Sequence, residues 1–285
     1  MFVIVLVCVI SFLIGGLFGK KLAERGITTD INLEKYHGQI LLGLIAIAIL
    51  ILSMYLLSVF NLMHRLIFII PTFIRLYLQA YFDKIILGLG CLVLGLLVFL
   101  ELSGKSSPRR MFQLSIAVGI VTVPLVIFLN FSLPLTNSLD KPKVKDQLVV
   151  LQTTNYTCAP SSIATLGRFT GKHPNLSERD VVKLANTNKF GTSTLAEIRA
   201  MEKLGLNPKY EYGLTVRDLV KIDRPALLHV RLKISGTVIS HAVALLSVNS
   251  QQQVLIIADP LSGLQKIKFD RLKGYWLGEA IFVNT

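Results

Sequence analysis

Four residues in the C-terminal half of the chain have the types and the order of a thiol active site. Cys158 lies in the run Q-T-T-N-Y-T-C-A-P-S-S-I-A-T-L, which begins at Gln152. His241 follows in S-H-A-V-A-L-L and Asp259 in V-L-I-I-A-D-P, each within an apolar run typical of a β-strand. A nucleophilic thiol, a base, a carboxylate that orients the base and an amide that binds an oxyanion are the groups needed to attack an acyl carbon.

The chemistry of each side chain predicts its role. Cys158 comes directly before a stretch with helical apolar spacing, Ala159–Phe169, and the N-terminus of a helix stabilises a thiolate. We expect His241 to take the thiol proton and later give it to the leaving amine, while Asp259 holds the imidazole tautomer. The Gln152 side-chain amide and the Cys158 backbone N–H are the expected oxyanion donors.

Each of these residues also has a structural interpretation. Cys158 could be a small packing residue in the core. His241 could be a half-buried polar residue on a strand, Asp259 the start of a turn, and Gln152 a polar residue at a strand end. His229, in the neighbouring predicted strand, competes for the role of base and is interpreted as structural. The order and spacing of the four residues together favour the catalytic interpretation.

The elements that must position these residues form an α+β domain, because predicted helices come first and predicted strands follow. A polar linker is expected at residues 139–146 and the domain at residues 147–285. The expected elements are a strand that ends at Gln152, the helix Ala159–Phe169, helices with capping boxes that begin at Ser177, Thr194 and Thr215, and strands in A-L-L-H-V-R-L, H-A-V-A-L-L-S-V, V-L-I-I-A-D, L-Q-K-I-K-F and Ala280–Val283. Gly205 is expected to end the second of these capped helices.

The C-terminal half resembles the bacteriocin-processing, double-glycine-leader cysteine peptidases, which have a papain-like fold. The run around Cys158 is similar to their nucleophile motif, and G-T-S-T-L-A-E-I-R-A-M-E-K-L-G-L to their second helical segment. The runs H-A-V-A-L-L, I-A-D-P-L-S-G and Y-W-L-G-E-A-I-F-V resemble their closing strands. The resemblance implies a triad of Cys158, His241 and Asp259, with Gln152 in the oxyanion hole.

The sequence departs from that family in two ways. Thr157 and Ala159 flank the cysteine, where the family usually has an acidic residue and a glycine. The peptidase-like half follows apolar segments here, whereas in the best-known members it precedes an ABC transporter. The run S-G-K-S at Ser103–Ser106 is not a P-loop, because Phe99 occupies the place of the upstream glycine. We therefore expect no ATP hydrolysis by this chain.

The first 138 residues predict an all-α bundle of about four membrane spans, each close to the 20 or so residues that cross a bilayer. Leu66–Phe82 is interpreted as an interfacial or re-entrant piece, or otherwise as a fifth span. Gly15 and Gly19 form a small-xxx-small pair that indicates helix packing. The expected spans are Phe2–Phe18, Ile40–Met63, Ile85–Leu100 and Met111–Leu135.

These features predict a multi-pass protein of the bacterial cytoplasmic membrane. Lys20 and Lys21 follow the first apolar segment instead of preceding it, which is unlike a secretory signal and favours an extracytoplasmic C-terminal domain. The net charge of +13 comes from scattered residues without a nucleic-acid motif, so we interpret it as a surface beside anionic lipid. The five histidines show no metal-ligand spacing, and no cofactor is expected.

The sequence therefore predicts a membrane-anchored cysteine peptidase that cleaves a peptide or protein at the membrane surface. The alternative is a non-catalytic assembly subunit, in which a peptidase-like domain binds a peptide or a membrane-protein partner. An amide-forming acyltransferase would use the same chemistry and stays open from the residues alone.

Overall fold

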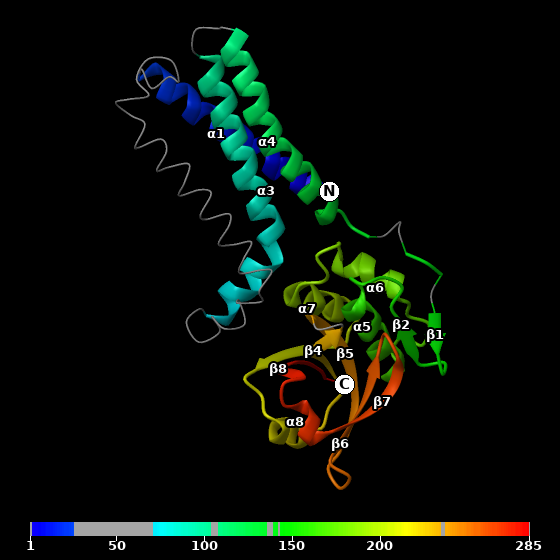
Figure 1. Ribbon diagram of the computed structural model, residues 1–285. Coiled ribbons are helices and arrows are strands. Elements are labelled where there is room, and N and C mark those ends of the chain that lie inside the picture. The colour runs from blue at the N-terminus through cyan, green and yellow to red at the C-terminus, as the bar shows by residue number, and fades with distance from the viewer. Residues whose placement is uncertain are drawn as a thin grey trace. The chain divides into compact units, whose positions relative to one another are not determined.

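A computed structural model describes residues 2–25, 71–103, 108–135, 139–141, 143–234 and 237–284 of the 285-residue chain. The chain forms two compact units, Met1–Leu133 and Pro134–Thr285. Figure 1 shows helices in the first unit and a sheet with helices in the second. Each unit is described by itself below.

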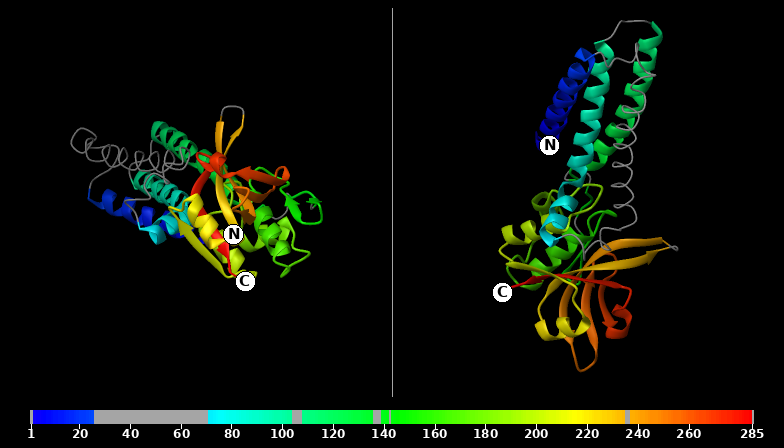
Figure 2. Two further views of the ribbon diagram at one scale, coloured as in Figure 1. Left: turned by 90° about the horizontal axis from the view of Figure 1, so that it is seen from below. Right: turned by 90° about the vertical axis from the view of Figure 1, so that its left-hand side faces the viewer.

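The described part of the first unit consists of three helices, α1 (Phe2–Glu24), α3 (Thr72–Leu102) and α4 (Pro108–Ser132). Helices α3 and α4 run side by side in Figures 1 and 2, and α1 packs across α3. Small residues bring two of them together: a Cβ atom added at Gly15 would overlap the carbonyl oxygen of Leu92, and one at Gly95 that of Phe12. Gly19 meets the Leu96 carbonyl in the same way.

Two helices within the described residues are long and apolar enough to cross a membrane, Phe2–Glu24 and Thr72–Leu100. They contain the first and third predicted spans. The second predicted span, Ile40–Met63, lies outside the described residues, and the fourth coincides with α4, so the prediction of four spans is not confirmed. Leu66–Phe82 was predicted to be a piece separate from the third span. For its described part this prediction is wrong, because α3 runs without interruption from Thr72.

The second unit contains a six-stranded antiparallel sheet with the order β3-β8-β4-β5-β6-β7. A two-stranded sheet of β1 and β2 precedes it. The strands are β1 (Lys143–Lys145), β2 (Val149–Leu151), β3 (Pro208–Tyr212), β4 (Ala226–Ile234), β5 (Thr237–Asn249), β6 (Val254–Asp259), β7 (Gly263–Lys268) and β8 (Trp276–Val283). Strands β4 and β5 extend beyond their neighbours, because β8 pairs with β4 only as far as Val230 and β6 pairs with β5 only from Ala244 (Figure 2).

Helices cover both faces of this sheet. Apolar residues of α5, α6 and α7 pack with Leu227, Ala244 and Ile281 in one buried cluster. Leu219 of α8 and Leu272 belong to a second buried cluster on the opposite face of the sheet. Its strand residues alternate along the strands with those of the first cluster. The helices are α5 (Cys158–Phe169), α6 (Glu178–Ala185), α7 (Thr194–Lys203) and α8 (Val216–Ile222), and a 3-10 turn spans Phe269–Leu272.

Most local predictions for this unit agree with the structure. Capping boxes at Ser177 and Thr215 begin α6 and α8, and Gly205 follows α7 with φ +63°. The third capping box is wrong: Ser193, not Thr194, is the N-cap of α7, and its side chain accepts a hydrogen bond from the Ala196 N–H. Strand β1 lies in the stretch expected to be a linker, and β3 was not expected.

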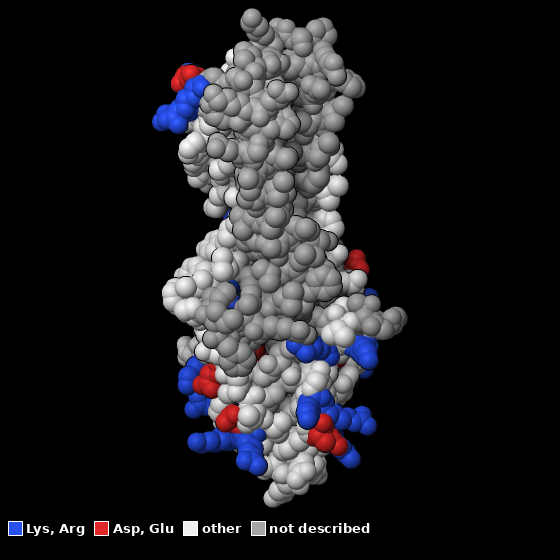
Figure 3. Space-filling model, turned by 60° about the vertical axis from the view of Figure 1, so that its left-hand side comes forward, with Lys and Arg blue, Asp and Glu red and all other residues white. Residues whose placement is uncertain are grey.

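Lysine and arginine side chains are spread over the C-terminal unit on the face shown in Figure 3, with acidic side chains among them. They form no single basic block on that face. This distribution agrees with the interpretation of the net charge as scattered.

Candidate active site

Cys158 is the first residue of α5. Thr157 occupies the N-cap but makes no side-chain capping hydrogen bond; its hydroxyl donates instead to the Thr154 carbonyl at 3.2 Å. The backbone N–H groups of the first helical turn, which have no partner within a helix, are therefore not taken by the Thr157 side chain. They remain to stabilise negative charge on the Cys158 sulfur.

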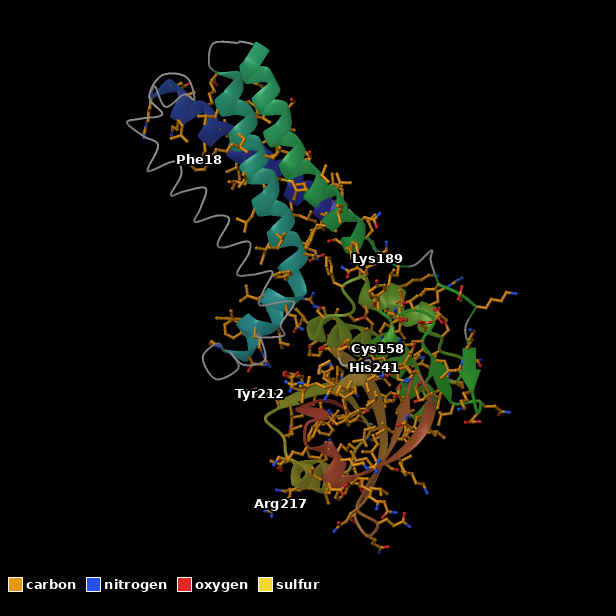
Figure 4. All side chains as sticks on the ribbon, viewed as in Figure 1. Phe18, Cys158, Lys189, Tyr212, Arg217 and His241 are labelled. Atoms are coloured by element: carbon orange, nitrogen blue, oxygen red, sulfur yellow. The ribbon has the colours of Figure 1, made fainter. Side chains whose placement is uncertain are left out.

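His241 on β5 lies between Cys158 and Asp259. Its Nε2 atom is 3.0 Å from Oδ1 of Asp259, and the Cys158 side chain interacts with its ring and raises its pKa. With Nε2 directed to the carboxylate, Nδ1 is the nitrogen left for the thiol. Figure 4 labels Cys158 and His241 next to each other. The structure thus brings three of the four predicted site residues together, with a hydrogen bond between His241 and Asp259.

This arrangement favours a charged imidazolium. Burial alone would lower the pKa of His241. The interactions with Asp259 and Cys158, including their negative charges, outweigh burial and raise this pKa from 6.5 to about 9. Burial raises the pKa of Asp259, yet the hydrogen bonds from His241 and the Leu261 N–H leave it below its ordinary value. Asp259 therefore also starts a turn, as its structural interpretation predicted, while it orients the histidine.

Buried hydroxyl groups fix α5 against the strands. Ser162 Oγ donates to the carbonyl oxygen of Ala242, the residue after His241, at 3.0 Å. Thr165 Oγ1 accepts from the Val150 N–H at 3.0 Å and donates to the Ser161 carbonyl at 2.9 Å. The helix that carries the thiol is thus held to the strand that carries the base and to β2, which ends beside Gln152.

Gln152 follows β2 and is held at both its backbone and its side chain. Its N–H donates to the Pro260 carbonyl at 2.9 Å, which places it beside the turn that contains Asp259. Its Nε2 donates one hydrogen to the Thr154 carbonyl at 2.8 Å. An amide nitrogen carries two hydrogens, so one remains for another acceptor. The Oε1 atom is buried and has no partner among the described residues.

A buried glutamate supports the loop between Gln152 and Cys158. Glu178, at the start of α6, is 1% exposed, and its Oε1 accepts from the Thr153 N–H at 2.9 Å. The sequence pattern did not single out this residue. Its only local signal was the capping box at Ser177, which explains a helix start but not a contact with a loop 25 residues earlier in the chain.

His229, the rival base, belongs to a separate buried cluster. Its Nε2 lies 2.8 Å from Glu197 of α7, and its Nδ1 lies 3.2 Å from Glu279 of β8. Burial lowers the pKa of His229, but both carboxylates together raise it to about 10. Since both ring nitrogens already have acidic partners, His229 is a charged structural residue and not a base for Cys158.

Cys158 lies beside an imidazole that is hydrogen-bonded to a carboxylate, and these are groups of a thiol-based acyl-transfer site. Within the residues that the structure describes, no group of three or more histidine, cysteine or acidic side chains is arranged to hold a metal ion.

The sequence model of the Peptidase C39 family matches residues 146–285. The resemblance predicted for the C-terminal half is thereby confirmed, and this half of the chain has the papain-like peptidase fold. An uncharacterized protein of Methanothermobacter marburgensis is 27% identical over 139 residues, which are 49% of this chain and 89% of that protein.

Similar solved structures are peptidase domains. That of Streptococcus ComA, a bi-functional ABC transporter of a quorum-sensing pathway, is 27% identical with a TM-score of 0.39 and matches 47% of this chain and 94% of its own. A double-glycine-motif protease from an AMS/PCAT transporter, in complex with a leader peptide, is 21% identical with a TM-score of 0.39 and matches 50% of this chain and 91% of its own.

Proposed function

We propose that the C-terminal half is a cysteine peptidase that cleaves a peptide or protein through Cys158, His241 and Asp259. The observation that carries the proposal is the position of His241, which interacts with the thiol at the N-terminus of α5 and lies 3.0 Å from a buried carboxylate. The match to a peptidase family over the same residues supports it.

The proposed reaction follows from these positions. His241 Nδ1 takes the thiol proton, and Cys158 Sγ attacks the acyl carbon of the peptide bond. The negative oxygen that forms accepts hydrogen bonds from the Cys158 N–H and from the second Nε2 hydrogen of Gln152. The imidazolium then protonates the leaving amine, and an acyl-enzyme thioester forms. Water deprotonated by His241 cleaves the thioester and restores the thiol.

The apolar helices α1 and α3 support a location at a membrane. We place the cleavage at the membrane surface, because the peptidase unit follows these helices in the sequence. The proposed substrate is a peptide or protein that reaches this surface.

The rival proposal is a binding module that has kept a peptidase fold without hydrolysis. It is favoured by Thr157, which is fully buried and bonded within its own loop where the family usually has an acidic residue. The complete set of Cys158, His241, Asp259 and Gln152 argues against it, since binding alone requires no thiol–imidazole pair.

The test is digestion of a peptide library by the purified full chain, with new termini identified by mass spectrometry. Wild-type protein is expected to generate new termini, and Cys158→Ala to generate none while binding detergent and unfolding like the wild type. Equal cleavage by both proteins would disprove the thiol mechanism, and no cleavage by either would favour the binding module.

A further inference from the structure

The entry segment of the C-terminal unit, described at residues 134–135 and 139–141, packs against the loop that carries the proposed oxyanion hole. Leu135 and Leu139 are 5% and 7% exposed and form a small apolar cluster with Val182 of α6. Tyr156, two residues before Cys158, packs against the same cluster. This cluster is distinct from the two larger cores that cover the faces of the sheet.

Hydrogen bonds hold this entry segment in place. The Leu135 N–H donates to the Thr187 carbonyl at 3.0 Å, just after α6. At the other end, Arg179 Nη2 donates to the Leu139 carbonyl at 2.8 Å. Backbone and side chains therefore both fix the segment to α6 and the residues that follow it.

Helix α6 connects the entry segment to the active-site loop. Glu178 and Val182 lie four residues apart, on one face of the helix. Val182 contacts the leucines, while the Glu178 carboxylate accepts from the Thr153 N–H, one residue after Gln152. The loop 152–157 is therefore held at two residues: Tyr156 packs against the apolar cluster, and Thr153 binds Glu178 of α6.

From these contacts we infer that Leu135 and Leu139 are positioning residues for the active site. They hold Tyr156 and α6, which in turn hold the loop that places Gln152 and leads into Cys158. The predicted effect on the cleavage rate rests on the proposed peptidase function, whereas the predicted effect on the loop's position does not. The chain entering this unit is thus a part of the active-site support and not a passive connection.

The test replaces Leu139 with Ala in the full chain and compares it with Leu255→Ala. Leu255 has 0% solvent exposure and lies near the start of β6, at the opposite end of that strand from Asp259. Both changes remove the same atoms from a buried site, so both are expected to lower the melting temperature. Only Leu139→Ala is expected to speed hydrogen exchange of the amides in residues 152–158.

Peptide cleavage by Leu139→Ala is expected to show kcat about 10- to 100-fold lower with KM little changed, since small misplacement of catalytic groups has effects of that order. If exchange in residues 152–158 and kcat both match those of Leu255→Ala, the inference is overturned. Should Leu139→Ala not fold, Arg179→Gln replaces the guanidinium that donates to the Leu139 carbonyl and is judged by the same two readouts. If the wild type cleaves no peptide, the exchange rates alone decide the inference.

Discussion

At the scale of single residues, the site joins groups that three separate elements supply. The thiol and its base come from α5 and β5, and the carboxylate from the end of β6. None of the three is adjacent in sequence, yet His241 contacts both others. Gln152 remains the proposed oxyanion donor, because its Nε2 uses only one of its two hydrogens on the Thr154 carbonyl.

Gln152→Ala removes one proposed oxyanion donor and leaves the thiol and base in place. We expect kcat to fall by roughly 10²–10³, the usual effect of losing one such donor. The rate of Cys158 alkylation by iodoacetamide, which forms no oxyanion, is expected to stay near the wild-type rate. A parallel fall in alkylation would show that Gln152 supports the loop and does not bind the oxyanion.

Asp259→Asn removes a negative charge that helps to raise the pKa of His241. That pKa is expected to fall from about 9 toward its ordinary value of 6.5. The alkaline limb of kcat/KM against pH, which reports loss of the imidazolium, should move to lower pH. An unchanged alkaline limb would contradict the contact between Asp259 and His241. Asparagine keeps an oxygen that can accept from the Leu261 N–H, so the turn is preserved.

At the scale of elements, a buried hydroxyl fixes the thiol helix against the strand of the base. Ser162→Ala leaves the Ala242 carbonyl without the donor that lies 3.0 Å away. We expect a loss of about 1–3 kcal/mol in the free energy of unfolding, as for other unsatisfied buried acceptors, together with a lower kcat.

Ser161→Ala is the matched control for this prediction. Ser161 is equally buried on the same helix, but its Oγ has no hydrogen-bond partner among the described residues. Its replacement should be neutral or stabilising. Equal destabilisation of the two variants in chemical denaturation would contradict the assigned role of Ser162.

At the scale of the whole molecule, the His229 cluster joins α7, β4 and β8. His229→Gln leaves Glu197, which is 2% exposed, without the cation that lies 2.8 Å away. The expected loss is roughly 3–5 kcal/mol in the free energy of unfolding near neutral pH. The variant in which both His229 and Glu197 become glutamine should lose less, because the buried charge of Glu197 is then removed as well.

The pH dependence of this loss follows from the raised pKa of His229. The charged histidine stabilises the folded state fully below pH 6.5, its ordinary pKa. This stabilisation is lost as the pH rises through about 10, its pKa in the folded protein. The difference in unfolding free energy between wild type and His229→Gln should therefore shrink as the pH approaches 10. A constant difference from neutral pH up to about 10 would contradict the charged cluster.

The sequence was most informative where local physics decides the structure. Apolar alternation predicted the closing strands, and the spacing after Cys158 predicted α5. The sequence did not predict contacts between residues far apart in the chain. Nothing near Glu178 indicates that it binds Thr153, and nothing near His229 indicates that two carboxylates bind its ring. Strand β3 was missed because Pro208–Tyr212 is short and half exposed, and it becomes a strand through its pairing with β8.

The most direct test of the central claim is the rate of Cys158 alkylation by iodoacetamide against pH, in detergent-solubilised full chain. Cys158→Ala measures the background from Cys8 and Cys91, and His241→Ala removes the paired base. We predict fast labelling that persists well below about pH 8 and is lost in His241→Ala, because the imidazolium stabilises the thiolate. Slow labelling that rises only near the ordinary thiol range of about 8.5, and is unchanged by His241→Ala, would contradict the claim.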